Sequence, residues 1–151
     1  MSSYNQSFRP VSSDKHYTYQ LRVGYADTDQ AGVVHHGAYV RYLESARIEY
    51  LRHYGVSYKE FEIDVHLALP VVEANIRYKR PAFFDDILHI EVWVGLITKA
   101  RLRFDSKIYR GQELLNEAQI TLACVHTTNG RPTSLPDILL SACQDSSAST
   151  Q

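Results

Sequence analysis

The sequence predicts an α+β domain in which one long helix packs against an antiparallel sheet of about five strands. Two observations support this class. Apolar residues recur at helical spacing through residues 37–54, and they alternate with polar residues in the segments that precede and follow. A long helix with one apolar face must bury that face, and a sheet of this length can curl around it. The periodicity fits another α+β sandwich topology about equally well.

The first strand is expected at residues 17–23, where aromatic and aliphatic side chains alternate with polar ones. Such alternation is typical of a strand that is buried on one face. The segment from Asp27 to Gly32 is then expected to be a loop, because aspartate and glycine both favour turns.

The long helix is expected from about Gly37 to Tyr54. Gly55 marks its end, because glycine readily adopts the left-handed conformation that often terminates a helix. Ser57 is followed three residues later by Glu60, which matches a capping box. A short second helix is therefore expected to begin there.

Four further strands are expected after the helices: residues 69–78, 88–96, 101–108 and 118–124. Segment 101–108 alternates most regularly, with charged side chains on one face and mainly apolar ones on the other. Turns are expected at Gly111-Gln112 and at Asn129-Gly130, and the second of these is a strong hairpin signal.

The composition is that of a single globular domain of 151 residues. A formal net charge of -1 gives no general attraction to nucleic acid or to anionic membranes. The 2 cysteines lack metal-type spacing, and no signal peptide or membrane-inserted segment is expected. We expect a cytoplasmic protein with flexible tails at 1–13 and 144–151 and one domain at 14–143.

Two carboxylates, Asp27 and Asp29, precede the long helix. Backbone N–H groups in the first turn of a helix have no intrahelical partner. A carboxylate just ahead of them therefore lies beside ready donors for an oxyanion, a layout that suits acyl transfer. The alternative is that both aspartates only hydrogen-bond the local backbone, the usual role of aspartate in a turn.

The segment from Tyr25 to Arg47 resembles the active-site segment of the hotdog-fold acyl-CoA thioesterases of the 4-hydroxybenzoyl-CoA thioesterase superfamily. It is most similar to the branch associated with the bacterial Tol–Pal system. The one departure is His35, which stands where the family usually has an aromatic residue before the histidine. Similarity extends over residues 17–127. The residues in register are Tyr25, Asp27, Thr28, Asp29, Gly32, Val33, Val34, His36, Tyr39, Glu44 and Arg47.

The resemblance implies a hotdog fold and hydrolysis of an acyl-CoA thioester to a free carboxylic acid and coenzyme A. It implies that Asp29 acts as nucleophile or general base and that a backbone N–H near His36 stabilises the oxyanion. The His36 side chain would orient the carboxylate or the attacking water. Tyr25 and Glu44 complete the expected catalytic set, and Gly32, Val34 and His35 are expected to bind substrate.

Three basic residues are also expected to bind substrate: Arg77, Lys79 and Arg80. They cluster at a predicted strand end, and coenzyme A carries a 3′-phosphate and a diphosphate that such side chains bind well. The alternative is ordinary charge alternation on a solvent-facing strand.

No cofactor is expected, since coenzyme A is part of the substrate. No metal is expected either, because the adjacent His35 and His36 lack a third ligand at suitable spacing. The resemblance further implies a homodimer or homotetramer with each site built across an interface. Two other functions stay open: a hotdog hydratase or dehydratase acting on a β-hydroxyacyl thioester, and a non-catalytic acyl-thioester-binding protein of the cell envelope.

Overall fold

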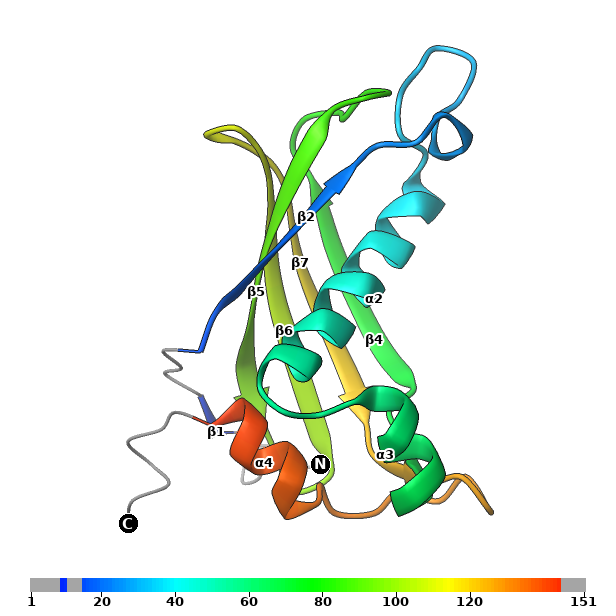
Figure 1. The fold of residues 1–151 in the computed structure, drawn as a ribbon, viewed down its shortest axis with the longest axis vertical. Coiled ribbons are helices and arrows are strands. Elements are labelled where there is room, and N and C mark those ends of the chain that lie inside the picture. The colour runs from blue at the N-terminus through cyan, green and yellow to red at the C-terminus, as the bar shows by residue number, and fades with distance from the viewer. Residues whose placement is uncertain (1–8, 11–14, 145–151) are drawn as a thin grey trace.

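A curled antiparallel sheet wraps around one long helix (Figure 1). The computed structural model describes residues 9–10 and 15–144. The long strands lie in the order β2-β5-β6-β7-β4, and β1 extends the β2 edge by pairing with the far end of β5. The elements in chain order are β1 (Arg9–Pro10), β2 (Tyr17–Arg22), the 3-10 turn η1 (Tyr25–Asp27), α2 (His36–His53), α3 (Tyr58–Val65), β3 (Leu67–Ala68), β4 (Val71–Tyr78), β5 (Ile87–Ile97), β6 (Arg101–Arg110), β7 (Glu113–Ala123), β8 (Val125–His126) and α4 (Asp137–Cys143).

The core lies between α2 and the face of the sheet that this helix covers. One face of α2 buries Ala38, Tyr39, Tyr42, Leu43, Ala46, Tyr50 and Leu51. Alternate residues of β5 and β6 are buried in the same core cluster: Leu88, Ile90, Val92, Val94, Leu102, Phe104 and Ile108. Burying one large apolar side chain contributes about 1.5–3 kcal/mol. This layer therefore fixes the position of α2 and of the loop at its N-terminus.

The hotdog architecture with a central helix is confirmed, and the predicted elements are present with small shifts at their ends, except that the strand expected at 118–124 begins already at Glu113. α3 begins after Ser57 as predicted, but the Ser57 side chain makes no capping hydrogen bond, so the expected capping box is wrong. The periodicity misses α4, because 7 residues after Pro136 are too few to show a helical repeat. The predicted tails lie outside the described residues, apart from β1 and Gln144.

The two edge strands of the sheet, β2 and β4, differ in how far other elements cover them. α2 lies against β2 and β5, whereas every residue of β4 except Ile76 is exposed. The exposed fractions of Val71, Val72 and Tyr78 are 47%, 46% and 42%. Among the described residues β4 pairs only with β7, so its outer edge is open. Long open edge strands with apolar side chains are normally covered by another element or chain.

No helix within the described ranges is both long and apolar enough to cross a membrane.

Candidate active site

The loop between β2 and α2 is built around a tight turn at Asp29. The Asp29 N–H donates to the Val33 carbonyl at 2.9 Å, and the Gly32 N–H donates to the Asp29 carbonyl at 3.0 Å. Gly32 has φ 80°, a conformation that side chains with a Cβ rarely adopt. The expected loop is confirmed, and Gly32 is explained by the backbone geometry of the turn.

The Asp29 side chain is held by backbone alone. Its Oδ1 accepts from the N–H of Ala31 at 2.9 Å and of Val33 at 3.1 Å. Asp29 is exposed, and its Oδ2 accepts no hydrogen bond from any residue that the structure describes. One carboxylate oxygen thus fixes the orientation while the other faces solvent.

Asp27 lies in the same loop and binds the helix instead. Arg41 and Tyr42, both on α2, donate to its two carboxylate oxygens, the Tyr42 hydroxyl at 2.8 Å. Burial raises the pKa of the Asp27 carboxyl, but the hydrogen bonds from Arg41 and Tyr42 and the Arg41 charge outweigh this and lower the pKa below its usual value. Its side chain is only 15% exposed. Asp27 therefore ties the loop to α2.

The far side of the turn is clamped by the segment between β4 and β5. The Val34 N–H donates to the Ala82 carbonyl at 2.9 Å, and the Phe84 N–H donates to the Gly32 carbonyl at 3.0 Å. Val33 and Phe83 form an isolated antiparallel bridge between these hydrogen bonds. Val34 is 2% exposed, so in a single subunit it anchors the loop in the core.

The entry of α2 supplies free backbone donors. His35 is the N-cap residue, and its Nδ1 accepts from the Ala38 N–H at 3.1 Å. The backbone N–H of His35 donates to the Asp27 carbonyl at 3.0 Å. The N–H groups of His36 and Gly37 follow in the first turn, where no intrahelical acceptor exists. Sequence reasoning did not identify His35 as the helix cap.

The His36 ring packs against β4. It stacks on the Tyr78 ring with 4.0 Å between centroids and 9° between planes, and Tyr39 meets Tyr78 edge-on at 5.4 Å. No hydrogen bond joins the His36 ring to Asp29 in the described residues. The side chain thus fixes the start of α2 against the end of β4.

The structure does not bring Tyr25 or Glu44 into contact with Asp29 within one subunit. Tyr25 is 79% exposed, and its ring meets the Phe84 ring edge-on at 5.4 Å. Glu44 pairs with Arg47 at 3.8 Å. Glu44 and Arg47 line a cavity of about 80 Å³ between α2, α3 and β7, away from the loop.

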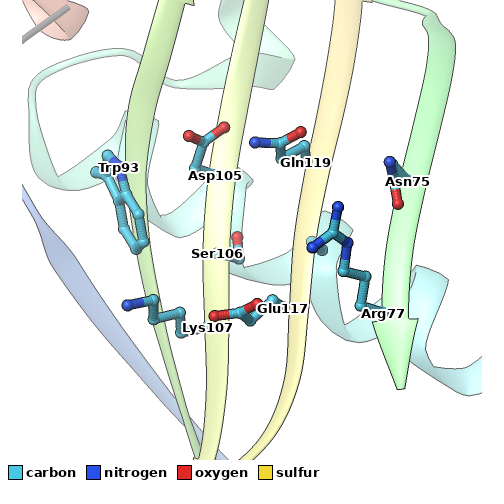
Figure 2. A pocket seen from close by; sticks show the side chains of 9 residues that line it. Asn75, Arg77, Trp93, Asp105, Ser106, Lys107, Glu117 and Gln119 are labelled. Atoms are coloured by element: carbon cyan, nitrogen blue, oxygen red, sulfur yellow. The ribbon is translucent and has the colours of Figure 1, made fainter. Parts of the chain in front are cut away.

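The three predicted phosphate-binding residues have different surroundings. Arg77 points to the face of the sheet opposite α2 and lines a hollow of about 200 Å³ together with Glu117 of the neighbouring strand and the more distant Trp93 (Figure 2). Ligand pockets are usually larger, at about 300–1,000 Å³. Lys79 pairs with Glu117 at 3.8 Å, and Arg80 pairs with Glu113 at 3.3 Å. Of the three, Arg80 adjoins the segment that clamps the Asp29 turn.

Sequence reasoning missed the residues that hold this site together. Arg41 binds Asp27, and Arg110 at the end of β6 binds Asp86 at 2.7 Å. Neither pair can be predicted from residue spacing, because the partners are 14 and 24 residues apart and come from different elements. No cluster of three or more metal-ligating side chains occurs among residues 9–10 and 15–144.

Comparison with known proteins identifies the family of this chain. The family model of the Thioesterase-like superfamily matches residues 23–143. The acyl-CoA thioester hydrolase YbgC of Escherichia coli is 35% identical over 121 residues, which cover 80% of this chain and 90% of that protein. A crystal structure of a hypothetical protein from Aquifex aeolicus has a TM-score of 0.80 and 29% identity, covering 85% of this chain and 99% of that one. A 1,4-dihydroxy-2-naphthoyl-CoA thioesterase from Synechocystis has a TM-score of 0.77 and 28% identity, covering 84% and 94%.

Proposed function

The chain belongs to the Thioesterase-like superfamily and is a thioesterase of the hotdog fold, and we propose that it hydrolyses acyl-CoA thioesters with Asp29 as its catalytic carboxylate. The observation that carries this proposal is the Asp29 turn, in which two backbone N–H groups orient one oxygen and leave the other open. Relatives named for acyl-CoA and for 1,4-dihydroxy-2-naphthoyl-CoA support a coenzyme A thioester as the substrate class.

The Asp29 carboxylate has two routes to the products. As a nucleophile, its free oxygen bonds to the thioester carbonyl carbon, the C–S bond breaks, and coenzyme A leaves as a thiolate that takes a proton. Water then attacks the resulting anhydride and releases the carboxylic acid and Asp29. As a general base, Asp29 accepts a proton from water while that water attacks the carbonyl carbon; the C–S bond then breaks, and the coenzyme A thiolate leaves and takes up the proton.

The developing oxyanion needs donors in either route. The first-turn N–H groups of His36 and Gly37 point out of the N-terminus of α2, where the helix dipole also favours negative charge. His36 contributes its backbone donor and, through the Tyr78 stack, the position of the helix entry. A hydratase or dehydratase uses a carboxylate and a histidine as a pair, and no hydrogen bond joins Asp29 to the His36 ring here.

A thiol-release assay over coenzyme A esters of short, medium, long and aromatic acyl groups tests the proposal. We expect coenzyme A to appear together with one equivalent of free acid. Binding of the esters without thiol release would support the non-catalytic alternative. Addition or loss of water across the acyl chain without thiol release would support the hydratase or dehydratase.

We propose that Arg80 is the basic residue that contacts a coenzyme A phosphate. Its side chain is 65% exposed and adjoins the segment that clamps the Asp29 turn. Arg80→Gln is expected to raise KM for the thioester on the order of 10- to 100-fold, since a charged hydrogen bond is worth about 1.5–3 kcal/mol. Arg77→Gln is the matched control, because Arg77 lies on the opposite face of the sheet. An equal rise in both variants would contradict the assignment.

We further propose that two subunits pair through β4, as a homodimer or within a homotetramer. Its open edge and its exposed Val71, Val72 and Tyr78 support this. Pairing there would bring residues of a second subunit to Tyr78 and His36, at the start of α2. Sedimentation equilibrium on the wild type and on Ala74→Pro tests the proposal, because the register of β4 on β7 turns the Ala74 N–H toward the open edge. A fully active 17.3 kDa monomer would contradict it.

A further inference from the structure

The segment that clamps the Asp29 turn is itself held by one guanidinium group. Arg110, the last residue of β6, donates from Nη1 to the Pro81 carbonyl at 3.2 Å and to Asp86 Oδ2 at 2.7 Å. Its Nη2 donates to Glu113 Oε1 at 2.7 Å. The guanidinium also lies over the Phe83 ring, 5.7 Å from the centroid. Arg110 therefore contacts both ends and the middle of segment 81–86.

Each link from Arg110 to Asp29 is a hydrogen bond or a strand-like bridge. Asp86 accepts from the Phe83 N–H at 2.8 Å, so the carboxylate that binds Arg110 also fixes the backbone of the segment. Phe83 bridges Val33, while its neighbours Ala82 and Phe84 bond to the backbone of Val34 and Gly32. The Val33 N–H then donates to Asp29 Oδ1 at 3.1 Å. A continuous series of contacts therefore joins the Arg110 guanidinium to the Asp29 carboxylate.

The segment needs such a restraint because part of it is strained. Asp85 has φ 73°, a left-handed conformation that non-glycine residues seldom adopt. Strain of this kind persists only where the surroundings over-determine the backbone. From the other side, Arg22 donates to the Asp85 carbonyl at 3.0 Å and to its carboxylate at 3.1 Å. Arg110 supplies the restraint that faces the Asp29 turn.

The chemistry of the contact requires arginine. The planar fork reaches Asp86, Glu113 and a carbonyl at once, which a lysine ammonium cannot do in a fixed geometry. The Arg110 side chain is 28% exposed, so a neutral replacement would leave Asp86 without its charged partner in a partly buried site, whereas Glu113 would keep Arg80 at 3.3 Å. Asp86 would then hold the Phe83 N–H less firmly, and the segment would loosen.

We propose that Arg110 is a positioning residue for Asp29, acting through segment 81–86, and this inference rests on the proposed role of Asp29 in hydrolysis. Arg110 touches neither Asp29 nor the donors at the start of α2. Arg110 instead keeps the Val33 backbone in place, and this preserves the hydrogen bond from the Val33 N–H to Asp29 Oδ1. A displacement of about 1 Å at a reacting group can cost on the order of 10²-fold in rate.

The same strand provides a matched control. Arg103 on β6 also forms a fork with a carboxylate, donating to Asp105 at 2.7 and 3.0 Å. That pair lies on the outer face of the sheet and has no link to the Asp29 turn. Arg103→Gln therefore removes a similar ion pair without disturbing the clamp.

The experiment compares wild type with Arg110→Gln, Arg110→Lys and Arg103→Gln. Thioester hydrolysis gives kcat and KM, and amide hydrogen exchange reports opening at Ala31 and Val33. We expect Arg110→Gln to lower kcat on the order of 10- to 100-fold with KM changed less than about 3-fold, and to speed exchange at both amides. Arg110→Lys should recover part of both effects, and Arg103→Gln should change neither.

Several outcomes would overturn the inference. One is faster exchange in Arg110→Gln with an unchanged kcat, because the chemistry would then not depend on the clamp. Another is a lower kcat with unchanged exchange, because the effect would not pass through Val33. If Arg110→Gln does not fold, Arg110→Lys carries the test by the same two measurements. If the wild type hydrolyses no thioester, the proposed function fails, whereas the exchange comparison still decides whether Arg110 holds the turn.

Discussion

Asp27 and Asp29 stand two residues apart in one loop, but their surroundings have little in common. Asp27 is satisfied by side chains of α2, with Arg41 and Tyr42 binding its two oxygens. Asp29 is held by two backbone N–H groups on a single oxygen and is exposed. At Asp27 both carboxylate oxygens tie the loop to α2. At Asp29 one oxygen stays without a hydrogen bond from the described residues and can react.

The difference separates a structural carboxylate from a candidate catalytic one by contacts rather than by residue type. A carboxylate with both oxygens bound by positively charged or hydroxyl donors is a poor nucleophile or base, because those donors stabilise its ground state. Backbone donors that bind only one oxygen orient the group and leave it reactive.

The largest expected effect is on turnover in Asp29→Asn. The amide keeps the size of the side chain and an oxygen that can accept from Ala31 and Val33, so the fold should be preserved. Loss of the positioned charge is expected to lower kcat by at least ~10²-fold. Single-turnover kinetics would measure this, and equilibrium titration with an intact thioester should give affinity close to wild type. Lost binding with unchanged turnover of bound ester would contradict the role.

Asp27→Asn is expected to act on stability. The substitution removes the charge paired with Arg41 and weakens the bond from Tyr42, at a cost of about 1–2 kcal/mol in the free energy of unfolding. Urea unfolding monitored by circular dichroism measures the loss. Arg52→Gln is a suitable control, because Arg52 forms an exposed ion pair with Glu49 elsewhere on α2. Equal losses of unfolding free energy in Asp27→Asn and Arg52→Gln would contradict a greater structural role for Asp27 than for an exposed ion pair.

His36→Ala is expected to cost less in kcat than Asp29→Asn, at most about 10-fold. The proposed oxyanion donor is backbone and survives the substitution, so the loss arises from the Tyr78 stack, worth about 0.5–1.5 kcal/mol. Steady-state kinetics on both variants gives the comparison. Equal losses would instead indicate that the imidazole and the carboxylate work as a coupled pair.

The smallest effect is the pH dependence of stability that Asp27 contributes. Its pKa is lowered in the folded protein, so its contribution is present above the unfolded value near ~4 and is lost as the pH falls through the folded value. Unfolding free energies of wild type and Asp27→Asn should therefore converge in acid. A constant difference down to about pH 2 would mean that Asp27 keeps its charge pair throughout.

Much of the fold follows from local pattern. α2 spans 18 residues, long enough for a helical repeat to be unambiguous. Strands β2, β5 and β6 alternate as expected, and the predicted loop around Asp29 lies ahead of α2. The resemblance, rather than the periodicity, separated the hotdog fold from other α+β sandwiches.

The remaining features depend on contacts that local pattern does not encode. The bonds from Arg41 to Asp27 and from Arg110 to Asp86 form only once separate elements pack together. Arg77 was grouped with Arg80 by charge, but strand parity places it on the same face as Glu117, opposite Tyr78. Side-chain direction along a strand alternates, so that signal was present in the sequence and was not used.

The most direct test of the account is kcat/KM for thiol release in Asp29→Asn beside Asp27→Asn. Both proteins would be assayed at a temperature where each is folded, with the ester that the wild type hydrolyses fastest. We expect Asp29→Asn to be at least ~10²-fold slower than Asp27→Asn, although Asp27→Asn is expected to be the less stable protein. Near-wild-type turnover in Asp29→Asn with a large loss in Asp27→Asn would show that the catalytic carboxylate is Asp27.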